Sequence, residues 1–203
     1  MSIRSVQGCL VACAFTFFMA QPASSQSSTT RGWSLGIHTQ GATLSVEDAD
    51  SDAGGGGGIQ IGYGINRRLT VFFAADGAII DAENAEIFSD DWNLAHVDLG
   101  LRFHFANSLK RWIPYLEVAG GVRAVSVDDT LVENIIDDVS FNGGAFTLGG
   151  GVTYYLNETL SLDLNAKFTS GNFTSNEIGN ITVGGLDIEA TSTRFGLGLV
   201  WWP

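Results

Sequence analysis

The chain has 203 residues, of which 45% are hydrophobic and 16% charged, with 26 glycines and 3 prolines. This apolar content excludes intrinsic disorder of the whole chain, and the length fits one domain. The net charge is −12, from 22 acidic and 10 basic residues. Such a charge repels phosphates, so we expect no nucleic-acid partner.

The first 25 residues have the layout of a secretory signal peptide. Arg4 precedes an apolar run over 9–20, and small residues at 23–25 form a cleavage site. The run is too short for a permanent transmembrane helix. We therefore predict a signal peptide over 1–25 and one domain over 26–203.

Both cysteines, Cys9 and Cys13, lie in this predicted leader. A mature domain over 26–203 would lack disulfides, catalytic thiols and cysteine-bound metals. An alternative processing route remains open, because residues 10–13 resemble a lipoprotein box in which Cys13 is acylated.

The main part of the chain alternates between apolar and polar residues. Between 160 and 169, for example, Leu162, Leu164 and Phe168 alternate with Asp163 and Lys167. No stretch after residue 25 reaches 18 consecutive apolar residues, so any membrane span must be made of strands. Eight segments fit strands, most of them long enough to cross a bilayer when tilted: 33–46, 57–66, 69–80, 92–105, 112–127, 141–156, 160–169 and 189–202.

The connections between these segments alternate in length. Short turns are expected at 66–68, 107–111 and 157–158. The long links are mostly acidic, and we expect loops at 47–52, 81–91, 128–139 and 172–187, with the glycine run 54–58 as a flexible loop leading into a strand. Short turns at one rim and long loops at the other are typical of outer-membrane barrels, with the turns periplasmic. The predicted fold is an all-β, eight-stranded antiparallel up-and-down transmembrane barrel.

Aromatic residues gather near the expected short turns. A girdle at the level of the lipid headgroups would account for them. The alternative is that they plug the ends of a soluble barrel. The residues concerned are Trp33, Tyr63, Trp112, Tyr155, Trp201 and Trp202.

Residues 112–122 (WIPYLEVAGGV) and 149–162 (GGGVTYYLNETLSL) resemble the small outer-membrane β-barrel family, which groups OmpA-like, OmpX-like and opacity-type proteins. The resemblance covers 32–202 and implies an up-and-down barrel in the Gram-negative cell envelope. It also implies outer-membrane lipid and lipopolysaccharide as partners, and we expect a monomer.

The last predicted strand resembles the family's assembly signal. Four residues match it: Arg194, Gly196, Leu199 and Trp201. The match implies recognition by the barrel-assembly machinery during insertion. The chain departs from the family pattern by ending in Trp202-Pro203, where an aromatic residue is usual.

If the apolar face meets lipid, the other face fills the barrel. An eight-stranded barrel is just wide enough to be filled by side chains, so charged residues inside it must pair. We predict a polar network of Asp98, Arg102, Glu117, Arg123, Asp163, Lys167 and Arg194, with His38, Gln60, Asp76, His96 and His104 also facing inward. The alternative is an open, narrow channel of the porin type.

Three histidines suggest a metal site or a general base. His96 and His104 are eight residues apart, roughly 26 Å along a strand, so they cannot share one site. Lipid A deacylases are also eight-stranded barrels, but they carry a His-x-Ser pair near the chain end. Here no histidine follows His104. We therefore expect no enzyme activity, metal or cofactor.

The acidic loops suggest a second hypothesis, the binding of divalent cations that bridge to lipopolysaccharide. Asp48, Asp50 and Asp52 are candidate ligands. Their spacing resembles the start of a calcium loop, but Ala53 and Ile59 occupy the glycine and glutamate positions of an EF-hand, which excludes that motif.

The sequence thus predicts a non-enzymatic integral outer-membrane barrel with a role in envelope integrity or surface contact. Two alternatives remain: a narrow channel for small solutes, and a soluble barrel that binds an apolar ligand. The charged residues on the other, polar face of the predicted strands disfavour a dry ligand cavity in that soluble barrel.

Overall fold

The computed structural model describes residues 30–46, 51–81, 92–105, 111–132, 135–178 and 181–203. The predicted signal peptide and lipoprotein box lie outside these residues. The described part contains no helix long and apolar enough to cross a membrane.

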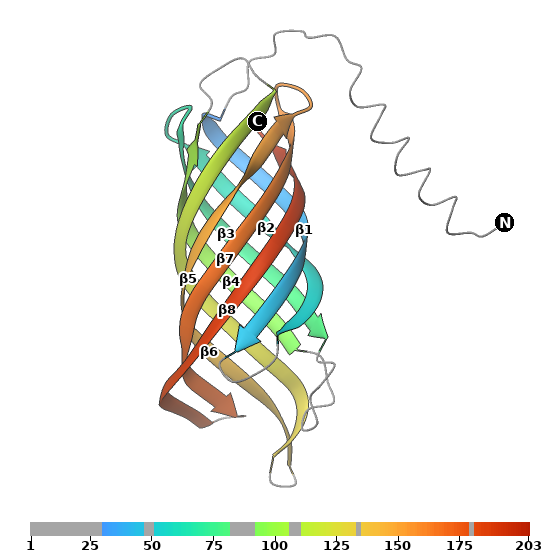
Figure 1. The fold of residues 1–203 in the computed structure, drawn as a ribbon, viewed down its shortest axis with the longest axis vertical. Coiled ribbons are helices and arrows are strands. Elements are labelled where there is room, and N and C mark those ends of the chain that lie inside the picture. Colours follow the sequence, from blue (N-terminus) through green and yellow to red (C-terminus); the bar gives the residue numbers. More distant parts are fainter. Residues whose placement is uncertain (1–29, 47–50, 82–91, 106–110, 133–134, 179–180) are drawn as a thin grey trace, which may run out of the picture.

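Eight antiparallel strands close into a barrel, as the sequence predicts (Figure 1). Each strand pairs with its neighbours in the chain, and β1 closes the sheet by pairing with β8. Closure leaves no free sheet edge in the barrel wall, so every strand is paired on both sides there. The strands are β1 (Gly32–Val46), β2 (Asp52–Gly64), β3 (Leu69–Asp81), β4 (Trp92–His104), β5 (Trp112–Val132), β6 (Ile135–Tyr155), β7 (Leu160–Ile178) and β8 (Ile181–Trp201).

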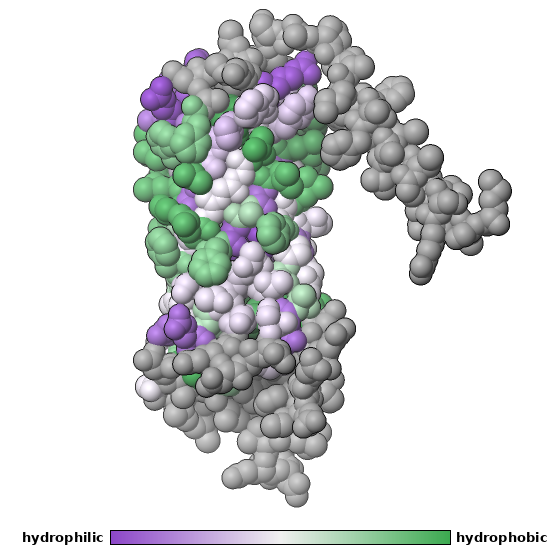
Figure 2. Space-filling model, viewed as in Figure 1, coloured by the Kyte–Doolittle hydropathy of each residue, from purple (hydrophilic) through white to green (hydrophobic). Residues whose placement is uncertain are grey.

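Alternation along each strand separates the two faces of the wall. In β4, exposed and buried residues alternate without interruption from Asn93 to His104. Leu99 is 62% exposed, whereas the flanking Asp98 is 2% exposed. Apolar side chains gather over the body of the barrel, and hydrophilic residues gather toward its two ends (Figure 2). The apolar outer face is the one that a hydrocarbon layer would cover.

Two predicted loops are instead hairpins. β5 and β6 remain paired up to Val132 and Ile135, and β7 and β8 up to Ile178 and Ile181. The prediction of loops over 128–139 and 172–187 was therefore wrong. Beyond the barrel wall neither face of the sheet needs to meet lipid, so β5–β8 remain paired there without regular alternation of apolar and polar residues.

The glycine run 54–58 is also not a loop. It forms the first half of β2 and pairs with β1 on one side and β3 on the other. A Cβ atom at Gly54 or Gly56 would collide with the backbone of Ile79 or Gly77 in β3. Glycine is needed here because the two backbones approach too closely for a side chain.

Candidate functional site

Asp76 is the centre of one ionic cluster inside the barrel. Its carboxylate lies 2.9 Å from Nε2 of His38 and 3.4 Å from Nζ of Lys167, and it forms an ion pair with Arg194. Arg194 also reaches Asp98, at 3.4 Å. Lys167 and Arg194 are direct partners across β7 and β8, so the carboxylate of Asp76 from the opposite wall offsets their repulsion.

Arg102 is the centre of a second cluster. Its guanidinium donates to Glu117 at 2.9 Å and to Gln60 at 3.0 Å, and its Nη1 lies 3.6 Å from Asp163. The Cζ atom of Arg102 also lies 3.9 Å from the ring centroid of Tyr115, a cation–π contact. Every charged group in this cluster therefore has a partner of opposite charge or an aromatic face.

Lys167 joins the clusters, since its Nζ lies 4.0 Å from Oε1 of Glu117. The structure thus brings together six of the seven residues proposed for the interior network: Asp98, Arg102, Glu117, Asp163, Lys167 and Arg194. Buried charges at these positions are stable only when paired, which this geometry provides.

Arg123, the seventh residue, lies apart from the network. Its Nη2 donates to the carbonyl oxygens of Gly171 and Ala190, each at 3.0 Å, and its Cζ lies 4.6 Å from the ring centroid of Phe173. Among the described residues, no carboxylate lies within ion-pair distance of Arg123.

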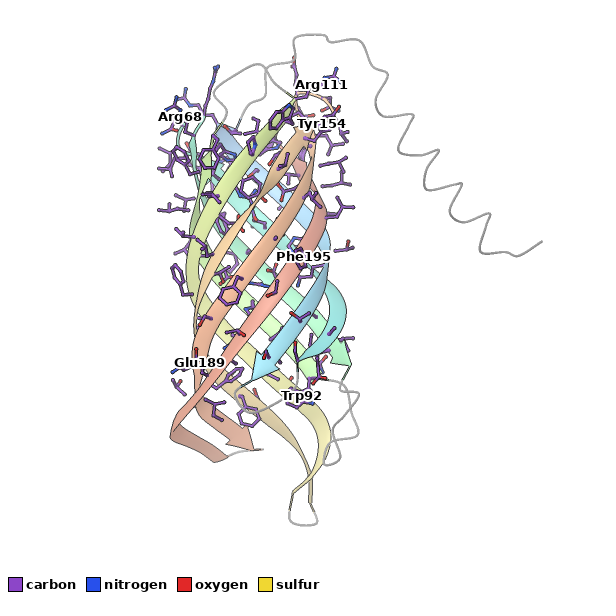
Figure 3. The ribbon with its side chains drawn as sticks, in the orientation of Figure 1. Arg68, Trp92, Arg111, Tyr154, Glu189 and Phe195 are labelled. Atoms are coloured by element: carbon purple, nitrogen blue, oxygen red, sulfur yellow. The ribbon has the colours of Figure 1, made fainter. Side chains whose placement is uncertain are left out.

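Apolar layers lie on both sides of the ionic network. Toward the long hairpins, the buried layer consists of Ala42, Leu44, Ala78, Ile80, Leu94, Val125, Phe173 and Ala190, with Trp92, Phe141 and Ile188 packed on it. Toward the short turns, the layer consists of Ile113, Tyr155, Val200 and Trp202. Figure 3 places Trp92 and Glu189 near the long-hairpin end, and Arg68, Arg111 and Tyr154 near the short-turn end. The ionic network of the barrel interior therefore lies between two apolar layers.

The short-turn layer corrects the predicted aromatic girdle. Trp33, Trp112 and Trp201 are more than half exposed on the outer face, as a girdle requires, and Tyr63 is 47% exposed. Tyr155 and Trp202 instead point into the barrel and are 1% and 4% exposed. Trp202 follows the outward-facing Trp201, so alternation places it inside, where its indole donates to Ser161.

Two depressions lie on the apolar outer surface of the barrel. The first lies over β1, β6, β7 and β8, between side chains that include Val152, Leu164 and Phe195. The second adjoins it near Ile37 and Leu199. Both are lined mainly by apolar residues and lie against the predicted hydrocarbon layer.

The candidate cation site is only partly described. Asp52 begins β2, where it pairs with Leu44, whereas Asp48 and Asp50 lie outside the described residues. Within the described ranges, no group of three or more histidine, cysteine or acidic side chains could hold a metal ion.

The other predicted residues are placed as alternation requires. Arg194 and Gly196 of the proposed assembly signal face inward, and Leu199 and Trp201 face outward. His96 and His104 are buried at separate points: Nε2 of His96 lies 3.5 Å from Ser192, and that of His104 lies 3.2 Å from Thr70.

Sequence reasoning missed several uncharged partners of the network. Tyr115 donates to Asp163 at 2.7 Å, and Thr153 donates to the same carboxylate at 2.9 Å. Thr147 and Thr169 contact each other at 2.8 Å, and Thr169 accepts from Arg194. Their inward position follows from alternation with Leu116, Leu148 and Phe168, but only charged residues were considered as network members.

The profile of the outer membrane protein beta-barrel domain family matches residues 10–201. No curated protein sequence matches the chain. Among solved structures, the chain is similar to Neisserial surface protein A, with 18% identity, 89% of this chain and 99% of that chain covered, and a TM-score of 0.59.

Two further structures share the fold. Ail, the attachment invasion locus protein of Yersinia pestis, is 13% identical, with 84% of this chain and 99% of that chain covered and a TM-score of 0.54. The outer membrane protein OprG from Pseudomonas aeruginosa is 14% identical, with 86% and 97% covered and a TM-score of 0.51. These likenesses agree with the closed eight-stranded barrel. The family profile spans nearly the whole chain, and the chain therefore belongs to the outer membrane protein β-barrel domain family.

Proposed function

We propose that this protein is a closed, non-enzymatic scaffold of the bacterial outer membrane that presents the long β5–β8 hairpins for surface contact. The observation that carries the proposal is the four-stranded extension beyond the barrel rim. β5, β6 and β8 have 21 residues each and β7 has 19, whereas β1 to β4 have 13 to 15. In Figure 1 the β5–β6 and β7–β8 hairpins project beyond the ends of β1 and β4.

Among the strands that the structure describes, the extension has two open edges. The pairing of β1 with β8 ends at Val46 and Ala190, so among the described strands residues 181–184, 188 and 189 pair with β7 only, and residues 185–187 lie in a register irregularity. The pairing of β4 with β5 ends at Trp92 and Val127, so residues 130–132 pair with β6 only, and residues 128–129 lie in a register irregularity. Unpaired backbone N–H and C=O groups at a sheet edge can bind an extended segment of another protein.

The interior supports a closed barrel rather than a channel. Ion pairs between opposite walls cross the middle, and an apolar layer lies on each side of them. An ion or polar solute crossing this interior would have to break buried ion pairs and pass two apolar layers, both of which are costly.

A surface-contact role has a parallel in one fold relative. Ail is an attachment invasion locus protein, and it has also been solved in complex with the heparin analogue sucrose octasulfate. The present chain is acidic, with a net charge of −12. We therefore expect the partner to bind along the sheet edge of this chain, or through basic groups of the partner's own, rather than through sulfate groups on the partner.

Site-specific tagging tests the proposal. A short epitope placed between 133 and 134 should be labelled by antibody on intact cells. The matched control carries the epitope between Asn157 and Glu158 in a short turn, and labelling should require permeabilised cells. Purified protein in a planar bilayer should give no discrete conductance steps. The reverse labelling pattern would contradict the orientation, and reproducible conductance would favour the channel.

A further inference from the structure

We infer that a groove along the β1–β8 seam holds one acyl chain of an anionic phospholipid whose phosphate lies at the short-turn rim. This seam groove consists of the two depressions on the outer surface, over β1, β6, β7 and β8 (Figure 1). The inference does not depend on the proposed surface-contact function, because it concerns the lipid-facing wall and the rim opposite the long hairpins. It is carried by the shape of the wall and by the division of charge between the two rims.

The seam groove has room for a chain. Its two parts have volumes of about 530 Å³ and 380 Å³ and share Thr39 and Leu197, so they are continuous. Gly150, Ala166 and Phe195 are successive cross-strand partners on β6, β7 and β8. Phe195 is 64% exposed, whereas Gly150 has no side chain and Ala166 has only a methyl group. The wall is therefore low beside a protruding ring, and the depression lies at this step.

The hydrocarbon layer is itself the path to the seam groove, because the groove opens on the outer face of the wall. Lipid chains are as apolar as leucine, so close packing, and not the burial of apolar surface, favours one chain over its neighbours. A depression that no atoms filled would leave its lining side chains without contacts on one side. A flexible acyl chain that follows the groove restores these contacts.

The height of the seam groove matches one leaflet of a bilayer. Figure 3 places Phe195 about midway along the barrel, and Trp33 and Trp201 are exposed toward the short-turn end. From Arg31 to Gly41 the chain of β1 rises roughly 33 Å, which at a tilt of about 40° is roughly 25 Å along the membrane normal. One leaflet with its head groups is roughly 20 Å thick. A chain whose head group lies at the short-turn rim would therefore end near Phe195.

The charge of the two rims selects the head group. Outside the predicted leader and the barrel interior, the chain has five basic residues, and in the sequence all of them lie in or beside the short turns: Arg31, Arg67, Arg68, Lys110 and Arg111. The same segments contain one acidic residue, Glu158. The other acidic residues outside the interior lie in or beside the segments that join β1 to β2, β3 to β4, β5 to β6 and β7 to β8. An anionic head group is therefore attracted to the short-turn rim and repelled by the other.

Two arginines lie at the sides of the seam groove. Arg31 directly precedes β1, and the carbonyl oxygen of Arg111 accepts from the backbone N–H of Tyr155 at 2.7 Å, where β6 ends. β1 and β6 are the outermost strands of the groove. A guanidinium can donate two hydrogen bonds to one phosphate. A lipid with net negative charge is favoured over a zwitterionic one, whose ammonium group the same arginines would repel.

Photo-crosslinking tests where the chain lies. The probe is phosphatidylglycerol with a diazirine near the end of one acyl chain, at trace level in phosphatidylcholine vesicles that contain the purified protein. Peptides from β7, β8 and β1 should be labelled at least about fivefold more than those from β3 and β4. Excess unlabelled phosphatidylglycerol should remove this label. Equal labelling around the barrel, or a seam left unlabelled because a second copy of the chain covers it, would overturn the inference.

Filling the groove tests its shape. A166F places a ring on the floor of the seam groove, at an exposed position where it costs no burial. It should lower labelling of the seam at least about fivefold. A95F makes the same change at an exposed position of β4, away from the groove, and should leave the labelling unchanged. Seam labelling that persists in A166F would contradict the site.

Charge variants test the head group. Native mass spectrometry measures how strongly the protein retains phosphatidylglycerol relative to phosphatidylcholine with the same chains. The double variant R31Q/R111Q should lower this preference about tenfold. R68Q, in the β2–β3 turn, should change it by less than about twofold, and E158Q should keep or raise it.

Heat-modifiable migration on a gel verifies that each variant folds. If A166F or the double variant does not fold, the labelling map and the lipid preference of the unmodified protein decide. Equal retention of the two lipids by the unmodified protein, an unchanged preference in the double variant or an equal loss in R68Q would each overturn the inference.

Discussion

The β1–β4 half and the β5–β8 half of the sheet follow different rules. Strands β1–β4 lie almost wholly in the barrel wall, where one face is apolar and the other faces the packed interior. Strands β5–β8 follow the same rule up to the rim and then continue beyond it as paired hairpins. The difference teaches that strict alternation is a requirement of the two-faced wall and not of strand pairing itself.

The largest expected effect comes from breaking the network that joins the two halves. Replacing Asp76 in β3 with leucine would leave Lys167 and Arg194 of β7 and β8 adjacent without their shared carboxylate. We expect a loss of about 3–5 kcal/mol in the free energy of unfolding. Urea unfolding in lipid vesicles, followed by tryptophan fluorescence, measures it. D52N, at the half-exposed start of β2, is the control and should change stability by less than about 0.5 kcal/mol.

A charge on the outer face tests whether the wall is in contact with lipid. Leu99 lies near the middle of β4 and is 62% exposed. L99R should cost about 2–4 kcal/mol, because a charged group at the bilayer midplane is poorly solvated. E189R, which places arginine at an exposed position near the rim, should cost at most about 1 kcal/mol. Equal effects at the two positions in vesicle unfolding would place Leu99 outside the hydrocarbon layer.

A side chain added to the glycine run tests the close approach of β2 and β3. At Gly56 a Cβ atom would collide with the backbone of Gly77, whereas at Gly144 it would meet nothing within 4 Å. G56V should therefore destabilise the barrel by about 1–3 kcal/mol. G144V should be near neutral. Chemical denaturation of both variants in one detergent measures the difference in stability. If G56V were as stable as G144V, strands β2 and β3 could separate without a loss of stability.

The smallest effect is expected from shortening the extension. Removing residues 131–136 deletes the paired end of the β5–β6 hairpin at Val132 and Ile135 but no residue of the interior network. The barrel should keep its heat-modifiable migration and lose no more than about 1 kcal/mol. Failure of this variant to fold would show that the extension is needed to form the wall.

Within the wall, the sequence predicted the structure closely. Alternation over 92–105 assigned Asp98 and Arg102 to the interior and Leu99 and Leu101 to the outer face, as the structure places them. The reason is physical, because a side-chain period of two fixes each residue's face once the lipid-facing one is known. The eight-stranded fold is confirmed by the strand pairing, and the family by the profile match over residues 10–201.

Beyond the rim the same signal misled. Acidic residues at 128–129 and 137–138 interrupt the alternation, so a loop was predicted where β5 and β6 remain paired. For the β7–β8 hairpin a better signal was present: the β-branched residues Ile178 and Ile181 lie on either side of a Gly-Asn pair, a pattern typical of a tight hairpin.

The interior was only partly predictable. Charged residues on the inward face indicated a network, but which pairs form depends on contacts across the barrel. Asp76 and Lys167, for example, are 91 positions apart in the sequence. The apolar layers were missed because Leu94 and Val125 lie on the face that the charged residues suggested would be polar throughout.

Closure of the sheet by β1 and β8 has a consequence for folding kinetics. The strands that meet at this seam are nearly the whole chain apart: the hydrogen bond from Thr39 to the carbonyl of Leu197 spans 158 residues. Until the last strand arrives, both edges of the growing sheet expose unpaired backbone groups, which a hydrocarbon layer does not tolerate. The contact order is high, so folding should be slow, and insertion must be coupled to closure after the chain has been completed.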